Sequence, residues 1–199
     1  MTTTTKKTTK TVKAKTTAIP NLPTNPFVFD VLEAVSKQRT KVKKIEVLKR
    51  YAHDSVMAVL IWNFDESVVS LLPEGEVPYG NTREDNSVTG SLSDKINDAV
   101  GMMRESGSAS LGSQDQGKAS IRGEYTKFYN FLKGGNNGLS SLRRETMFIN
   151  ILEGLHPLEA EILVLVKDKK LTDRYKITKD VVSAAYPQIT WGGRACLNH

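Results

Sequence analysis

The sequence predicts a mainly α-helical fold, a compact multi-helical domain with a disordered basic N-terminal arm and a flexible insertion. Three observations lead to this prediction. Apolar residues recur at helical spacing through most of residues 25–79 and 119–191. Glycine, proline and helix-capping residues divide these stretches into short segments. Residues 1–24 and 80–118 differ in composition, being polar and poor in large apolar side chains.

Residues 1–24 form the predicted arm, which contains five lysines, many threonines and no acidic residue. Such a segment cannot bury enough apolar surface to offset the entropy of ordering, so we expect disorder. It lacks the apolar region of a secretory signal, and a transit peptide is a less favoured alternative because lysine replaces arginine. An arm that contacts nucleic acid and a tail that only aids solubility are equally favoured.

Residues 25–79 predict three helices in the first part of a single domain. The first is expected to begin with Asn25 as its N-cap and Pro26 as its first residue. Thr40 is expected to cap the second. The predicted apolar faces contain Val28, Leu32 and Val35 in the first helix, and Val42, Ile45, Leu48 and Ala52 in the second.

The third helix is expected to start at Asp54 or Ser55. Residues 56–62 are rich in β-branched side chains, so a strand is the alternative there. A short apolar segment covers residues 67–72. Regular structure is then expected to end among three turn-forming residues, Pro73, Gly75 and Pro78.

Residues 80–118 predict a flexible insertion or linker, because they are rich in glycine, serine, asparagine and aspartate. One amphipathic segment lies inside it, at residues 92–103, with Ser91 as a candidate N-cap. We expect this segment to pack as a short helix on its own domain. A partner-binding helix is the alternative.

Residues 119–191 predict four more helices in the second part of the same domain, followed by a tail at 192–199. The predicted boundaries are a stop at Gly134, a helix from about Ser141 to Gly154, one from Pro157 capped by His156, and one capped by Thr178 that ends before Pro187. The expected inward residues are Ile121, Tyr125, Phe128 and Leu132; Leu142, Ile149 and Leu152; Leu158, Ile162 and Val166; and Val181, Val182 and Ala185.

No pattern typical of a catalytic or cofactor site is present in the sequence. The glycine cluster at 134–138 lacks the ending of a phosphate-binding loop and is better explained as a helix stop. Cys196 and His199 have the spacing of half a zinc site, which needs four ligands. Glu159 and Glu161 are interpreted as acids that favour the start of a helix. We expect no enzyme activity, no cofactor, no metal and no small-molecule substrate.

Charge gives the strongest functional indication. The net charge is +6, and residues 37–50 hold seven cations against one acid. A cationic helix of this kind is typical of contact with a phosphate backbone, and a merely solvated face is the alternative. The segment after residue 176 also weakly resembles a helix-turn-helix. The candidate nucleic-acid-binding residues are Lys37, Arg39, Lys41, Lys43, Lys44, Lys49 and Arg50.

Several strings in the chain are distinctive: FYNFLKGGN, RRETMFINILEGLHPLEAE, LVKDKKL and YPQITW. Together with NPFVFDVLEAVSKQRTKVKKIEVLKRY and VLIWNFDESVVSLLPEGEVPY, they resemble a family of uncharacterised proteins from T4-like bacteriophages, especially those of marine cyanobacteria. The arm, the insertion and the tail depart from the resemblance. It implies a phage protein made in the host cytoplasm, and it assigns no catalytic residue.

These observations predict a non-enzymatic phage accessory protein that contacts DNA or RNA through its basic helix and arm. The alternative is a structural or assembly component of the virion. It would bind other phage or host proteins through Tyr125, Phe128, Tyr129 and Trp191. No apolar run approaches the ~18 residues that cross a bilayer, so no membrane contact is expected. The single cysteine excludes an internal disulfide and indicates a reducing compartment.

Overall fold

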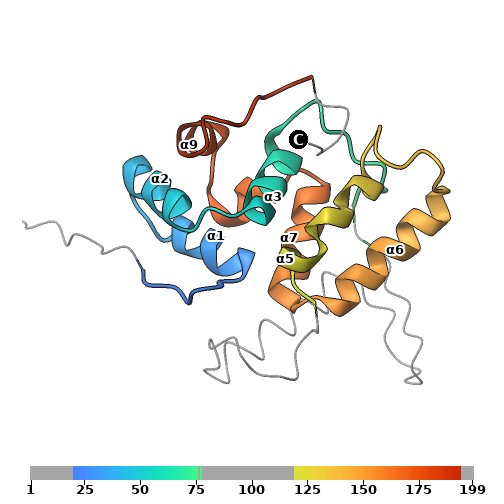
Figure 1. The fold of residues 1–199 in the computed structure, drawn as a ribbon, viewed down its shortest axis with the longest axis horizontal. Coiled ribbons are helices and arrows are strands. Elements are labelled where there is room, and N and C mark those ends of the chain that lie inside the picture. Colours follow the sequence, from blue (N-terminus) through green and yellow to red (C-terminus); the bar gives the residue numbers. More distant parts are fainter. Residues whose placement is uncertain (1–19, 76, 78–118, 194–199) are drawn as a thin grey trace, which may run out of the picture.

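The computed structural model describes residues 20–75, 77 and 119–193 (Figure 1). The predicted arm, the insertion with its amphipathic segment, and the Cys196–His199 pair all lie outside these residues, apart from a few positions at their edges. The described residues form eight α-helices and one 3-10 helix and no strand, which confirms the predicted fold class. The helices are α1 Val28–Ser36, α2 Lys41–Arg50, α3 Asp54–Phe64, α5 Ile121–Glu124, η1 Tyr125–Phe131, α6 Ser141–Gly154, α7 Pro157–Lys167, α8 Leu171–Tyr175 and α9 Lys179–Ala185.

Helix α7 lies at the centre of the described structure, where it packs against α1, α3, α6 and α8 (Figure 1). Helix α2 packs against α1 and α9 at one edge, and η1 packs against α3 and α6 toward the other. Helices from both ends of the chain therefore share one hydrophobic core.

The capping predictions are largely correct. The Thr40 side chain accepts the Lys43 N–H at 3.4 Å at the start of α2. His156 Nδ1 accepts the Leu158 N–H at 3.2 Å at the start of α7. Thr178 occupies the N-cap position of α9, but its side chain makes no capping hydrogen bond. The residue types near these helix starts therefore predict where the helices begin.

The expected start of the first helix is wrong, because α1 begins two residues after Pro26. Phe27, not Asn25, is the N-cap, and the Asp30 carboxylate accepts the Phe27 N–H at 3.1 Å. The Pro26 carbonyl instead accepts the Arg122 Nε–H at 2.8 Å. A long-range contact therefore holds Pro26 outside the helix.

Three predicted inward residues point to solvent. Val42 in α2 is 73% exposed and Leu142 in α6 is 75% exposed, and Ala52 is exposed as well. The buried residues of α2 are Val47 and Leu48. A helical repeat alone fits more than one face, and here packing against α1 and α9 selects the face.

Most other predicted inward residues are buried, and they come from seven of the helices and the segment that follows η1. They are Val28, Leu32, Val35, Leu48, Ile121, Phe128, Leu132, Leu152, Ile162, Val166, Val181, Val182 and Ala185. Ile45, Tyr125, Ile149 and Leu158 are only partly buried. The inward prediction thus holds at helix ends, as at Val28 and Ile121, as well as inside the helices.

Residues 56–62 are helical, so the strand alternative is wrong. They lie within α3, which begins after His53, whose Nδ1 accepts the Ser55 N–H at 3.1 Å. Val56, Val59 and Leu60 are fully buried. Because α3 is buried on most sides, its apolar residues form a nearly continuous run that does not distinguish a helix from a strand.

The first helix expected after the insertion is divided. Only Ile121–Glu124 is α-helical, and Tyr125–Phe131 continues as a 3-10 helix. Residues three apart align on a 3-10 helix, which places both Phe128 and Phe131 in the core. The Trp62 ring lies 5.3 Å from the Phe128 ring between centroids, so the tighter helix completes an aromatic cluster.

Candidate functional site

The seven cations predicted as binding residues lie on α2 and the turn before it. We call this set the basic surface: Lys37, Arg39, Lys41, Lys43, Lys44, Lys49 and Arg50. All are exposed except Lys43 and Lys44, which are half-buried. The predicted residues thus lie on one helix and the turn before it, around the buried Val47 and Leu48.

Some of these cations already have partners. Lys37 pairs with Glu33 at 2.8 Å, an exposed i,i+4 ion pair of small energetic value. The Arg50 guanidinium lies 5.6 Å from the centre of the Tyr51 ring and donates to Asn21 Oδ1 at 3.4 Å. These contacts orient the two side chains while leaving their charge accessible to solvent.

Three other cations have no ion-pair partner in the described part of the chain. The side chains of Arg39, Lys41 and Lys49 form no ion pair within the described ranges 20–75, 77 and 119–193. They are also exposed. Within the described residues their charges are therefore not neutralised by an ion pair, and binding of such cations to a polyanion gains from counterion release.

Lys44 connects the basic surface to the C-terminal helices. Its Nζ donates to the Lys176 carbonyl at 2.6 Å, at the end of α8. Burial lowers the Lys44 pKa, and the nearby Lys176 ammonium lowers the same pKa further. The end of α8 thus contributes a further cation next to the predicted set, and no local sequence signal indicates it.

Glu159 is a buried acid that was interpreted only as a first-turn residue of a helix. It lies in the first turn of α7, is fully buried, and accepts two backbone N–H groups from other helices. Its Oε1 accepts from Val28 at 3.0 Å and its Oε2 from Ile121 at 2.7 Å. Burial raises the Glu159 pKa to about 7, although both hydrogen bonds oppose this. Glu161 differs, since it pairs with Arg174 at 3.0 Å.

The geometry can now be set beside known proteins. A family model described as a family of unknown function, DUF6433, matches residues 31–100 and 105–173, which is more than half of the chain. The chain belongs to the DUF6433 family. The predicted resemblance to a family without assigned function is thus confirmed at that level, and the description of DUF6433 names no phage. No curated protein and no solved structure matches the chain.

The DUF6433 match includes all of α2 and all of α7, and it ends within α8. It therefore contains the whole basic surface and Glu159, while Lys176 lies beyond its end. The family assigns no role to any of these residues. Their chemistry has to be judged from the structure.

The glycine-rich segment at 134–138 is held by a buried cation. Arg144 donates through Nε to the Asn130 carbonyl at 2.8 Å. It also donates to the carbonyls of Asn136 at 3.1 Å and Leu139 at 3.0 Å. These contacts explain the segment as a turn that packs on α6, in agreement with its interpretation as a helix stop.

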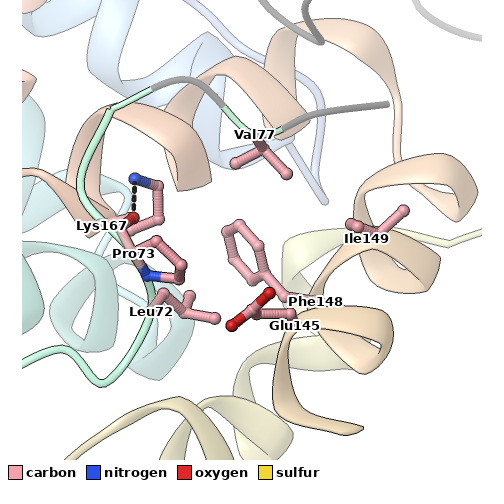
Figure 2. A pocket seen from close by; sticks show the side chains of 7 residues that line it. All are labelled: Leu72, Pro73, Val77, Glu145, Phe148, Ile149 and Lys167. Atoms are coloured by element: carbon pink, nitrogen blue, oxygen red, sulfur yellow. Dashed lines mark hydrogen bonds between the residues drawn. The ribbon is translucent and has the colours of Figure 1, made fainter. Parts of the chain in front are cut away.

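A small pocket lies beside Lys167 (Figure 2). Its volume is about 40 Å³, and its apolar lining surrounds the Phe148 ring. Lys167 Nζ donates to the carbonyls of Pro73 at 2.7 Å and Gly75 at 2.9 Å and to the Asp168 carboxylate at 2.5 Å. All three donor positions of this ammonium are occupied, so the lysine fixes the 73–75 turn.

The aromatic residues proposed for protein contact are mostly covered. Phe128 is fully buried and Tyr125 is half-buried, whereas Tyr129 is 37% exposed. Trp191 is half-buried, with Lys179 Nζ 5.2 Å from the centre of its ring. Phe128 is therefore a core residue, because its ring packs on Trp62.

The described part of the chain holds neither a metal cluster nor a membrane-spanning helix. It contains no cluster of three or more histidine, cysteine, aspartate or glutamate side chains that could hold a metal ion. None of its helices is both long enough and apolar enough to cross a membrane. The Cys196–His199 pair is outside the described residues.

Proposed function

We propose that this DUF6433 protein binds nucleic acid by contacting its phosphate backbone through the basic surface. The supporting observation is that Arg39, Lys41 and Lys49 are exposed on or beside one helix without an ion-pair partner in the described residues. Helix α2 is fixed against α1 and α9, so these charges are held in place before a ligand arrives.

The expected binding is electrostatic and independent of base sequence. Each cation that neutralises a phosphate of duplex DNA releases counterions and contributes about −0.9 to the slope of log affinity against log salt concentration. Three contacts from the unpaired cations therefore predict a slope of about −3. Base readout would require additional side chains in a groove, and no observation supports such contacts.

The test is fluorescence anisotropy with a labelled 20-base-pair duplex of arbitrary sequence, titrated at several salt concentrations. The double variant Arg39→Glu/Lys41→Glu removes two cations while sparing the core, since both side chains are exposed. An acid at residue 41 also favours the start of α2. We expect the magnitude of the slope to fall by about 2 and the affinity at 50 mM salt to fall at least ~100-fold.

The matched control makes the same change of charge elsewhere. Lys133 and Arg143 are exposed residues. Lys133 follows η1, and Arg143 is in α6, a helix that lies across the molecule from α2 (Figure 1). Lys133→Glu/Arg143→Glu is expected to keep most of the affinity. The proposal fails if the wild-type protein does not bind at 50 mM salt, or if the two double variants lose affinity equally.

The biological setting follows from the resemblance of the distinctive strings to uncharacterised phage proteins. On that basis, the protein is a phage-encoded accessory protein that acts without catalysing a reaction, inside the infected host cell. Quantitative proteomics of infected cells and of purified virions tests this setting. Stoichiometric amounts in virions would instead support the structural or assembly role.

A further inference from the structure

The turn between α8 and α9 carries a cation in an unusual backbone conformation. Lys176 ends α8 with φ 52° and ψ 38°, the left-handed region that glycine or asparagine normally occupies. A lysine there is strained relative to glycine, because its Cβ approaches the carbonyl oxygen. Nothing in the turn requires the lysine side chain for packing, since Lys176 is exposed.

The position of Lys176 is fixed by contacts on both sides. Its N–H donates to the Thr172 carbonyl at 2.9 Å, and its own carbonyl accepts the Lys44 ammonium at 2.6 Å. Thr172 Oγ1 also donates to the Ile177 carbonyl at 3.0 Å. The turn is therefore locked against α2 while the Lys176 side chain is directed to solvent.

Two unfavourable features coincide at this place. Lys176 has a strained backbone, and its charge lies close enough to Lys44 to make the protonation of Lys44 less favourable. Residues in strained conformations are concentrated at ligand contacts, where a bound group offsets the strain. An anion bound between α2 and this turn would attract the ammonium groups of both lysines and so offset the repulsion between them.

We propose that Lys176 is a second anchor for the same ligand, so that a nucleic-acid backbone bound along α2 continues onto the turn between α8 and α9. This inference rests on the proposed function. It adds a binding residue that is 126 positions beyond Arg50 in the chain and outside the DUF6433 match. The partner is a nucleic acid rather than an acidic protein, because evenly spaced phosphates can reach both elements in succession.

The decisive variant is Lys176→Gly, since it separates binding from folding. Glycine accepts the left-handed backbone, so the melting temperature is expected not to fall. Loss of the cation is expected to reduce the magnitude of the salt slope by about 0.9 and the affinity at 50 mM salt roughly tenfold. Lys176→Arg keeps the cation and is expected to keep the slope. Lys133→Gln, which removes one exposed cation outside the basic surface, is the matched control.

The outcomes separate this inference from the proposed function. If the wild-type protein does not bind the duplex, both are overturned. If it binds and Arg39→Glu/Lys41→Glu weakens it while Lys176→Gly leaves slope and affinity unchanged, only the role of Lys176 is overturned. Equal affinity for poly-L-glutamate at the same salt would overturn the choice of nucleic acid in favour of an acidic polypeptide.

Discussion

At the scale of single residues, the Glu159 carboxylate caps two helices. The first turns of α1 and α5 each leave backbone N–H groups without partners inside the helix, and Glu159 accepts one from each, from Val28 and Ile121. The acceptor is therefore shared between segments that are distant in sequence. Burial opposes its ionisation strongly enough to place its pKa at about 7.

This pKa predicts a specific pH dependence of stability. Because the folded-state pKa is raised above the model-peptide value of 4.5, the folded protein binds the proton more tightly than the unfolded chain. The contribution of Glu159 to the free energy of unfolding is thus fully present below pH 4.5 and is lost as pH rises toward 7. It is on the order of 3 kcal/mol in total. Glu159→Gln removes it, so we expect the variant to gain stability relative to wild type over this range, measured by urea unfolding.

Comparison with the variant is needed because other groups titrate in the same range. Burial lowers the pKa of His156, which makes its own contribution grow with rising pH. The dependence of wild-type stability on pH therefore sums opposing effects. The difference in stability between the variant and the wild type isolates the contribution of Glu159. If the variant instead loses stability relative to wild type as pH rises, the two N–H bonds outweigh burial and the carboxylate is ionised well below pH 7.

At the scale of elements, local signals account for most helix boundaries. Thr40, His156 and Pro157 mark helix starts by chemistry that acts within a few residues, and the sequence reveals it. The short helix α8 was not predicted, because its start depends on a distant side chain: Asn63 Oδ1 accepts the Leu171 N–H at 3.1 Å. The exposed face of α2 was only partly predicted, because packing against α1 and α9 selects which face is buried.

The segment between η1 and α6 provides a test of how a buried cation maintains an element boundary. Arg144 donates to three carbonyls at once, and a lysine cannot reproduce this planar arrangement. Arg144→Lys is therefore expected to lower the free energy of unfolding by about 2 kcal/mol. The adjacent Arg143 is exposed, and Arg143→Lys is expected to change stability by less than ~0.5 kcal/mol. Equal effects in urea unfolding would contradict this assignment.

At the scale of the whole molecule, long-range polar contacts join the two described parts of the chain. Lys167 holds the turn at Pro73, and the Tyr186 hydroxyl donates to the Leu48 carbonyl at 2.8 Å. Apolar periodicity predicted that both parts contain helices but not which helices meet. Such pairings depend on individual side chains that reach across the core, and one sequence gives no signal for them. The basic surface was predicted because charge is visible without knowing these pairings.

The contact between Tyr186 and Leu48 ties α2 to the segment after α9. Burial raises the pKa of Tyr186 above its usual range, which keeps the hydroxyl protonated as a donor. Tyr186→Phe leaves the buried Leu48 carbonyl without this donor and is expected to cost about 1–2 kcal/mol in thermal unfolding. Hydrogen exchange in α2 is expected to accelerate more than exchange in α6. Uniform acceleration across both helices would show that α2 has no separate dependence on this bond.

The double cap at Glu159 also has a consequence during synthesis. Val28 leaves the ribosome long before its acceptor, which lies 131 residues later in the chain. At 5–20 residues per second, the wait is roughly 7–26 s. During this interval the nascent α1 lacks both the Glu159 acceptor for the Val28 N–H and the α7 surface that covers it, so its apolar side is available to chaperones. Completion of the N-terminal helices is thereby coupled to translation of the second half of the chain.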